Sequence, residues 1–477
     1  MFGLSLDTII KKDLLRILDN YSDYVSTKFL VDHIEYANHY IVKKSLIELY
    51  DEIRTNYATE DLSLKISKNR GVKLYSKNGN LYDLINSFIS KDIAYQILLT
   101  VIVQRCVPSK VLCEELFISE SSLRRRIKEI NSDLANYHLR ITFSQHIRLI
   151  GPEHMIRVIH FILLFYVYRQ LENLPNMEDQ IIYRQMAAQV THYLYLPATS
   201  HQQEVLAFFL LANDHAIKGK NALTYNKEEL TFFSEFTLPE FPKFLLGWNF
   251  LDWQFLFLFL SISDWPGLTL SLDLKKDIDF SKTAVVDLWM ISLERTFSPI
   301  QFESREQIKE KVYKQLMFNS FFPLDDTLFN TFHAYDYMTI TNLYPFYMHK
   351  FNTFWKKFIA TYPEYDSNFS RQKNLLLVIS LFPITEYSPE IKVYNYSHMT
   401  TTHNHFIEQQ VSNYFCSRYN IIFVDHMDDA DIIIGTHAPS KQTLHTNPET
   451  VIIESVLSKG DFDRIERAIN QALSANI

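Results

Sequence analysis

A chain of 477 residues is long enough for about three to five domains, and its 47% hydrophobic content lets each bury a core. Its 9 glycines argue against the glycine-rich loops that cradle nucleotide phosphates. The 3 cysteines lack metal or redox spacing and suit the reducing cytosol, so we expect a cytoplasmic protein. No signal-peptide pattern is present and the apolar runs are too short for a bilayer, so we expect no membrane contact.

Charge is divided unequally along the chain. The formal net charge is −8, yet residues 1–150 hold 21 Lys and Arg against 18 Asp and Glu. That part therefore carries +3 and the remainder −11. Because Lys and Arg neutralise DNA phosphates, the balance favours nucleic-acid contact by the first 150 residues, and sensing or assembly by the rest.

Residues 1–79 have the pattern of a winged helix-turn-helix. The predicted elements are helices over 26–34 and 38–52 and hairpin strands over 62–66 and 72–75. Asn69 and Gly71 supply the turn between the strands. The expected DNA contacts are Asn38, His39, Tyr40, Lys43, Lys44, Lys68, Arg70 and Lys73. The alternative is a degenerate winged helix that serves as a dimer or spacer module.

Residues 80–152 repeat this pattern with a stronger basic signal. Residues 108–130 indicate a short helix, a tight turn and a longer helix with Ser119 at its N-cap. A hairpin is predicted from 139–143 and 147–151. One apolar face is formed by Val111, Leu112, Leu116, Leu123, Ile127 and Ile130.

The longer helix has the features of a DNA-reading helix. With Leu123, Ile127 and Ile130 inward, its basic side chains point outward or flank the outer face. An arginine fork can read guanine in the major groove or hold phosphate. The expected DNA contacts are Ser121, Ser122, Arg124, Arg125, Arg126 and Lys128 on the helix and His146 and Arg148 on the hairpin. The alternative is a solvated helix with a chance basic triplet.

The remaining pattern changes from helical to mixed. Residues 153–388 are almost wholly helical, and polar segments at 264–267 and 275–279 divide them into two halves. The predicted helices cover 155–171, 177–195, 202–218, 250–263, 282–297, 304–318, 326–335, 343–362 and 368–382. Residues 383–389 form a linker by composition. Strands at 391–396, 421–425, 431–435 and 451–454 with helices at 404–419 and 461–473 then predict a small parallel α/β domain.

This order of domains resembles the Mga/AtxA family of virulence and global regulators from Gram-positive bacteria. The sharpest local match is the second winged helix, at 119–127, with its hairpin end at 147–151. Residues 148–151 are similar to the wing end of BglG/MtlR-type regulators. The fold class is then multidomain and mainly α, with tandem winged helix-turn-helix domains, two helical domains and a C-terminal α/β domain.

The resemblance implies specific domains and partners. Residues 153–272 and 273–388 would be phosphotransferase regulation domains (PRDs), and 389–477 an EIIB-like domain. The family implies a dimeric, activating transcriptional regulator that responds to sugar uptake through histidine phosphorylation. Its partners would be A·T-rich or curved promoter DNA, a second copy held through the EIIB-like domain, and a phosphocarrier of the phosphotransferase system. No cofactor is expected.

Histidines of the first helical half are the phosphorylation candidates that the resemblance implies. They are His201, His215 and His192, of which His201 and His215 are the best placed for access by a phosphocarrier. His160 lies in an apolar run and is expected to be buried. Each candidate taken alone is more often a structural or surface histidine.

Two departures from the family pattern limit the chemistry. Residues 312–318, where many PRDs carry a histidine, contain none, and the second half has only His333 and His349. EIIB enzymes carry their phosphoryl group on a cysteine directly after the first strand, but residues 397–402 contain no cysteine. The α/β domain is therefore expected to be non-catalytic and to serve dimerisation or partner binding.

Two other classes of function stay open from the residues alone. An RNA-binding antiterminator would need a small β-rich head at the N-terminus, which the helix-turn-helix repeats disfavour. A phosphoryl-transfer component of sugar uptake would need the missing cysteine. No G-x-S-x-G, H-E-x-x-H or Walker pattern is present, so we expect no enzyme, and the acidic turn at 425–429 is interpreted as a strand end, not a metal site.

Overall fold

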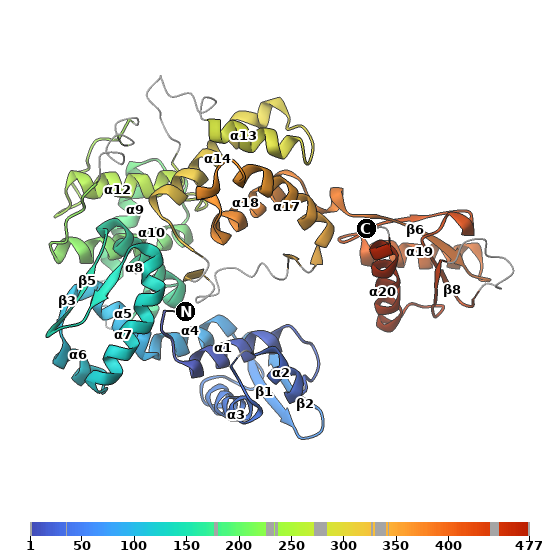
Figure 1. Cartoon of the computed structure of the whole chain (residues 1–477), viewed down its shortest axis with the longest axis horizontal. Coiled ribbons are helices and arrows are strands. Elements are labelled where there is room, and N and C mark those ends of the chain that lie inside the picture. The colour runs from blue at the N-terminus through green and yellow to red at the C-terminus, as the bar shows by residue number, and fades with distance from the viewer. Residues whose placement is uncertain are drawn as a thin grey trace. The chain divides into compact units, whose positions relative to one another are not determined.

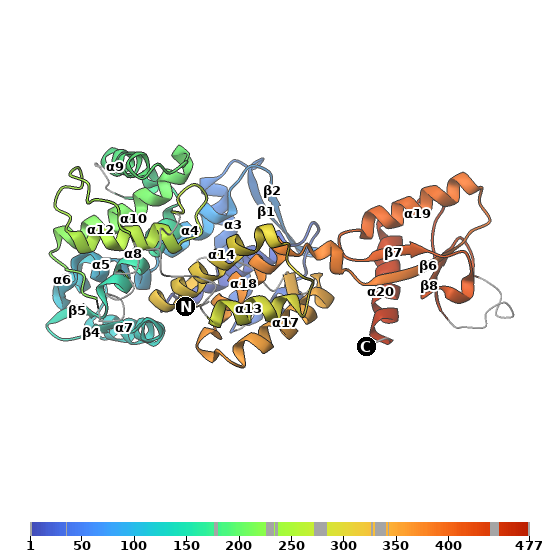
Figure 2. The same ribbon diagram turned by 90° about the horizontal axis from the view of Figure 1, so that it is seen from above.

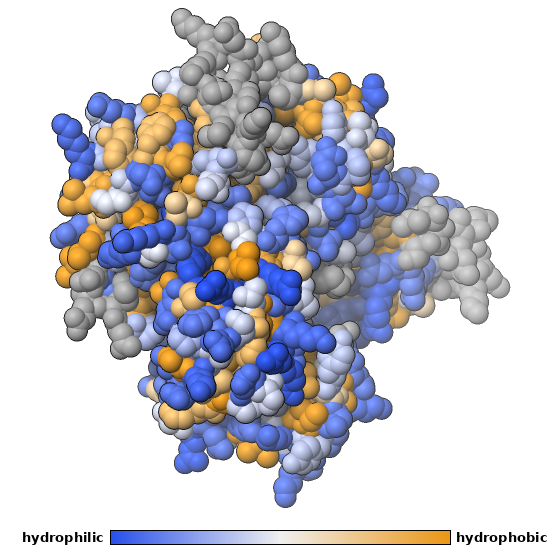
Figure 3. Space-filling model, turned by 60° about the vertical axis from the view of Figure 1, so that its left-hand side comes forward, coloured by the Kyte–Doolittle hydropathy of each residue, from blue (hydrophilic) through white to orange (hydrophobic). Residues whose placement is uncertain are grey.

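The computed structural model describes residues 2–34, 36–175, 180–225, 233, 237–270, 284–325, 328–329, 340–341, 343–438 and 448–475. Helices dominate the chain until the C-terminal sheet (Figure 1, Figure 2). Contacts divide it into two units, Met1–Lys282 with Glu310–Tyr335, and Thr283–Lys309 with Asp336–Ile477. On the face drawn in Figure 3, hydrophobic side chains lie scattered among hydrophilic ones.

The first head is a three-helix domain with a hairpin, and we use this name for residues 2–79. Its elements are α1 (Leu6–Asp19), α2 (Thr27–His33), α3 (His39–Asn56), β1 (Leu62–Ser67) and β2 (Gly71–Ser76). Ser26 and Asn38 cap α2 and α3 through their side-chain oxygens. The antiparallel pairing aligns Leu64 with Leu74, and both are buried. The predicted helices and hairpin are confirmed.

The second head, residues 80–152, contains the other helix-turn-helix. Its elements are α4 (Leu81–Lys91), α5 (Ile93–Gln104), β3 (Cys106–Pro108), α6 (Ser109–Glu115), α7 (Glu120–Leu134), η1 (Ala135–Tyr137), β4 (Arg140–Thr142) and β5 (His146–Ile150). The strands form an antiparallel sheet in the order β3-β5-β4. The prediction omits α4, α5 and β3. The prediction that Val111 belongs to the buried apolar face is also wrong: Val111 is 40% exposed, because it lies on the outer side of α6.

Helices after the heads bury much of the apolar sequence. In the first unit they are α8 (Glu153–Tyr168), η2 (Leu171–Asn173), α9 (Gln180–Tyr193), α10 (Ser200–Lys218) and α12 (Phe250–Ile262). All residues of α8 from Met155 to Val167 are buried. The guanidinium of the fully buried Arg157 donates to Asp252 at 2.7 Å and to Asn213 at 3.1 Å. A buried ion pair thus joins α8 to α12.

The second unit begins with helices. They are α13 (Ala284–Glu294), α17 (Pro345–Ile359), η4 (Pro363–Tyr365) and α18 (Asn368–Leu381), while α14 (Phe302–Phe321) runs through the boundary between the units. Trp289 donates to Asn374 at 2.7 Å and so ties α13 to α18. The helices predicted in both halves are found, except that most of 326–335 lies outside the described residues. The polar segment predicted at 275–279 also lies outside them.

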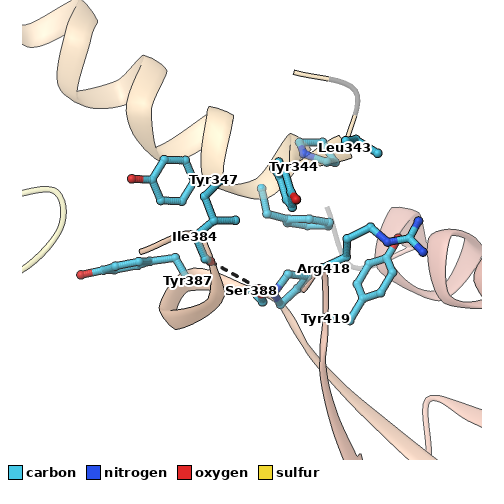
Figure 4. A pocket seen from close by; sticks show the side chains of 11 residues that line it. Leu343, Tyr344, Tyr347, Ile384, Tyr387, Ser388, Arg418 and Tyr419 are labelled. Carbon is cyan, nitrogen blue, oxygen red and sulfur yellow. Dashed lines mark hydrogen bonds between the residues drawn. The ribbon is translucent and has the colours of Figure 1, made fainter. Parts of the chain in front are cut away.

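The chain between α18 and the sheet is packed, which corrects its interpretation as a linker. It forms η5 (Ile384–Tyr387), and the Tyr387 ring packs at 5.2 Å from Phe297. Figure 4 shows Tyr387 beside a cavity that Tyr347 of α17 and the preceding Tyr344 also line, with Arg418 and Tyr419 on the opposite side. Aromatic packing therefore covers the junction between the helices and the sheet of this unit.

The C-terminal sheet is parallel, as predicted. Its elements are β6 (Glu390–Tyr396), α19 (Thr401–Phe415), β7 (Asn420–Phe423), η6 (Met427–Asp429), β8 (Ile432–Gly435), β9 (Glu449–Ile452) and α20 (Lys459–Ala475). The strand order is β7-β6-β8-β9, and every pairing is parallel. One apolar cluster joins α19 and α20 to alternate strand residues, among them Val393 and Ile434. Among the described residues, no helix is long and apolar enough to cross a membrane.

Candidate nucleic-acid interface

The sequence places an N-cap at the start of α7 and thereby fixes which side chains face outward. The Ser119 hydroxyl accepts from the Ser122 backbone N–H at 3.2 Å. Leu123 and Ile127 are buried beneath the helix. Of the predicted contacts on α7, Ser121, Arg124, Arg125 and Lys128 are exposed, whereas Ser122 and Arg126 are half-buried.

Arg125 and Lys128 are the free charges of this helix. Both are exposed, and within the described part of the chain neither has a carboxylate partner. Arg124 differs, because it pairs with Glu120 at 3.3 Å and its guanidinium lies 4.2 Å from the centroid of the Phe143 ring. That contact joins α7 to the hairpin. Arg125 and Lys128 can therefore approach phosphates or base edges without breaking an ion pair.

Arg126 flanks this outward face, as the helical period predicts, but its guanidinium is already bonded within the protein. Its Nη1 donates to the Gly3 carbonyl at 3.2 Å and to Glu129 Oε2 at 3.0 Å, and 22% of its side chain is exposed. One hundred degrees of rotation per residue places Arg126 on the side of α7 next to the buried stripe. The three arginines are consecutive, but they serve different contacts.

The second hairpin is fixed to α7 by one amide side chain. Asn131 donates to the Ile141 carbonyl at 2.8 Å and accepts from the Ile141 N–H at 2.7 Å. Along β5, His146 and Arg148 are exposed and alternate with buried Ile147. Both predicted wing residues thus face solvent. Arg140 on β4 is also exposed, and its alternation with the buried Leu139 and Ile141 would have predicted it.

The first head presents a weaker positive face. Its predicted contacts on α3 and at the N-cap are all exposed: Asn38, His39, Tyr40, Lys43 and Lys44. Lys44 pairs with Glu48 at 3.6 Å, and Lys11 binds the same carboxyl at 2.6 Å. The hydrogen bond from Lys11 lowers the pKa of Glu48, so this carboxylate stays charged beside Lys44. Lys43 is the freer of the two lysines.

The first hairpin carries basic side chains over tyrosine rings. Lys68 and Arg70 are exposed at its turn, and Arg70 lies 6.0 Å from the Tyr24 ring. Lys73 is half-buried, 4.6 Å from the Tyr75 ring, and Lys65 lies on the same ring at 4.4 Å. Lys65 is absent from the predicted contacts, although it alternates with buried Leu64 along β1.

Residues 77–166 match the family model of the Mga helix-turn-helix domain. The match covers α4 to β5 and most of α8, and so includes Arg125, Lys128 and the hairpin that flanks them. This part of the chain is an Mga helix-turn-helix domain, which supports membership of the Mga/AtxA family. It is a DNA-binding transcriptional regulator. No curated protein matches the chain.

The candidate phosphorylation histidines differ in exposure. His201, at the start of α10, and His192, near the end of α9, are exposed. His215 is half-buried, and its ring stacks on that of His160 with 5.5 Å between centroids. The Nδ1 atom of His215 is buried. Stacking on His160 of α8 covers one face of the His215 ring, so His215 is less accessible than His201 and His192.

Buried histidines in this pair are held neutral. His160 is 1% exposed, as expected from its apolar run. Burial lowers the pKa of His160 well below its ordinary value, and the neighbouring His215 lowers it further. Burial also lowers the pKa of His215, although Asp214 opposes that shift.

Histidines of the α/β domain meet at the carboxyl ends of adjacent strands. His398 follows β6 and His437 follows β8, and Nε2 of His437 is hydrogen-bonded to Nδ1 of His398. His403 Nε2 lies 2.6 Å from the Ser455 carbonyl. His333 lies outside the described residues. Cys416 caps the far end of α19, away from the start of that helix.

Proposed function

We propose that this regulator activates promoters through two heads per subunit and that phosphotransferase-system phosphorylation tunes its assembly. In this proposal it works in the cytoplasm as a homodimer held through the α/β domain, has no catalytic activity of its own, and controls global or virulence genes. The observation that carries the DNA-binding part is the pair of exposed charges Arg125 and Lys128, which have no carboxylate partner among the described residues.

The charges of the second head suit an A·T-rich or curved duplex. Arg125 and Lys128 lie one turn apart on α7, the helix whose N-terminal residues would meet base edges. Arg148 on the hairpin is placed to contact a flanking phosphate or the minor groove. Arg124 and Arg126 are paired with carboxylates and Asn131 is bonded to Ile141. This leaves few side chains of α7 free for bidentate base contacts, so readout would depend on DNA shape as well as on bases.

DNA binding through α7 is tested with Arg125→Ala in the full chain. We expect weaker binding to a promoter duplex at fixed salt and a smaller slope of log K against log salt, by about 1. Arg467→Ala, an exposed arginine of α20, is the matched control and should change neither quantity. Unchanged affinity in Arg125→Ala would remove α7 as the reading helix. A parallel titration with RNA hairpins should show weaker binding than the promoter duplex does. Tighter binding to RNA than to the duplex would favour an antiterminator.

His201 is the phosphorylation candidate that this proposal favours. It is exposed in the first turn of α10, where the helix dipole favours negative charge. One turn later Glu204 accepts from Arg184 at 2.8 Å and from the Leu171 N–H at 2.7 Å. A phosphoryl group on His201 would compete with Glu204 for Arg184 and so alter the contact between α9 and α10.

Phosphorylation is tested by incubation with phosphoenolpyruvate and the general phosphocarrier proteins, followed by mass spectrometry. We expect one phosphoryl group that is lost in His201→Ala and kept in His192→Ala. Absence of any label would refute phosphotransferase control and leave the DNA-binding function untouched. The mass of the protein in solution, with and without promoter DNA, tests the dimer.

A further inference from the structure

Residues 2–5 cross from the first head to the second, and we call them the N-terminal strap. Phe2 is 2% exposed, and its ring stacks on the Tyr137 ring with 5.8 Å between centroids and 16° between planes. Its backbone N–H donates to Asp133 Oδ2 at 2.6 Å. Asp133 and Tyr137 lie at the end of α7 and in η1, so the strap begins on the reading helix of the second head.

The middle of the strap lies directly on the back of α7. Gly3 has φ +68°, and a Cβ there would lie 2.9 Å from Ile130 Cγ1, closer than such atoms normally approach. Its carbonyl accepts the hydrogen bond from Arg126 Nη1 at 3.2 Å. Only glycine combines this backbone conformation with this close approach. Arg126 thus holds the strap on a side of α7 that is rotated by about 100° from Arg125.

The end of the strap is tied to the start of α5. The Ser5 N–H donates to Asp92 Oδ2 at 2.9 Å, and the Thr8 hydroxyl donates to the same oxygen at 2.7 Å. The other oxygen, Asp92 Oδ1, caps α5 by accepting from the Ala94 N–H at 2.9 Å. Ser5 is itself the N-cap of α1. One buried carboxylate therefore joins the first turns of α1 and α5, which belong to different heads.

We infer that the N-terminal strap, clamped by Arg126 and Asp92, sets the spacing between the two reading helices α3 and α7. The inference rests on the proposal that both heads contact DNA. Two binding modules on a rigid connection gain affinity only when both sites fit at once, so a fixed connection makes binding depend on the separation of the two contact sites. Arg126 and Gly3 are then positioning residues, which act on DNA binding through α7.

The test uses the promoter duplex protected by the full-length protein and two derivatives with 5 or 10 base pairs inserted between the protected segments. An insertion of half a helical turn moves the second site to the opposite side of the duplex, so wild type should bind it about tenfold or more weakly. Arg126→Ala and Gly3→Val should bring the affinities for the three duplexes closer together. The salt slope on the original duplex should change little in Arg126→Ala, because Arg126 touches no phosphate.

Arg125→Ala is the matched control from the same triplet. It should weaken binding to all three duplexes, lower the salt slope by about 1, and keep the wild-type spacing preference. If Gly3→Val unfolds the head, Phe2→Leu loosens the strap without a clash and gives the same comparison.

Each outcome decides the inference. Wild-type spacing preference in Arg126→Ala and Phe2→Leu, or no spacing preference in wild type, would overturn it. A fall in the salt slope for Arg126→Ala equal to that for Arg125→Ala would also overturn it, because Arg126 would then be a phosphate contact. Failure of the wild type to bind any duplex would instead refute the proposed function.

Discussion

At the residue scale, ion pairing determines which basic side chains are available to DNA. Arg125 and Lys128 have no carboxylate partner in the described chain, whereas Lys44 faces Glu48 at 3.6 Å. An exposed ion pair is worth little in stability, but breaking it offsets part of the gain from a phosphate contact. Lys44→Ala should therefore reduce DNA affinity less than Lys43→Ala does, as measured by fluorescence anisotropy at one salt concentration. Equal losses would contradict this ranking.

The buried Arg157 gives a prediction of stability at the same scale. Replacing it with Met leaves the carboxylate of Asp252, 1% exposed, without its charged partner. Breaking such a buried pair costs about 3–5 kcal/mol of unfolding free energy. We expect a loss of this size for Arg157→Met in urea denaturation. Arg467→Met, which changes an exposed side chain, should lie within about 0.5 kcal/mol of wild type.

The stacked pair His160 and His215 predicts a pH dependence. Since burial lowers the pKa of both, the unfolded chain binds more protons than the folded chain below about pH 6.5. The unfolding free energy should therefore fall as the pH drops below that value and stay level above it. The charged groups near the pair are Arg105, Asp214 and Lys218.

The measurement is denaturant unfolding between pH 5 and 8, a window around the ordinary histidine pKa. His160→Phe, which cannot titrate, should flatten the decrease at low pH. The control His192→Ala changes an exposed histidine and should keep the wild-type profile. A wild-type profile in His160→Phe would show that other groups cause the decrease.

At the element scale, the second hairpin depends on the two hydrogen bonds between Asn131 and Ile141. Asn131→Ala leaves the Ile141 N–H and carbonyl without this partner, which costs about 1–3 kcal/mol. The hairpin should then move relative to α7, so DNA affinity should also fall. Ser132→Ala, which changes the adjacent exposed hydroxyl, is the control for both measurements. A loss of stability without a loss of DNA affinity would show that the position of the hairpin does not affect DNA binding.

At the scale of the whole molecule, one carboxylate links the second head to the segment Glu310–Tyr335 of the same unit. Asp325 accepts from Asn136 at 2.7 Å and from the Tyr137 hydroxyl. Burial raises the pKa of Tyr137, and the hydrogen bond to Asp325 raises it further, so the phenol stays protonated as the donor. Asp325 follows α14, the helix whose first residues belong to the second unit and whose last residues belong to the first.

Asp325→Ala should lower the unfolding free energy of the full chain by about 1–3 kcal/mol, since the buried Tyr137 hydroxyl loses its acceptor. Asp264→Ala, at an exposed loop position, provides the comparison. Circular dichroism during heating measures both variants. An identical transition in wild type and Asp325→Ala would show that the bond contributes nothing to stability.

Local pattern was sufficient for the elements that bear the candidate DNA-binding residues. Ser119 and Asn38 are caps in the structure because a side-chain oxygen can accept from the first helical turn whatever the surroundings. Alternation of buried and exposed residues likewise determines both hairpins and the parallel strands of the α/β domain. The three-residue strand β3 has no such local signal. It forms by pairing with β5, which lies about 40 residues further along the chain, so the sequence did not predict it.

The sequence by itself determined α3, α7, the hairpin after each of them and the positive charge of residues 1–150, because each follows from local period, capping or counting. Only the tertiary structure paired Arg126 with Gly3, placed Lys11 on the carboxylate that Lys44 faces and packed His215 on His160. The partner of Arg126 is Gly3, 123 residues away, and that of His215 lies on another helix. Contacts of this kind arise from packing between distant segments, which no local pattern contains.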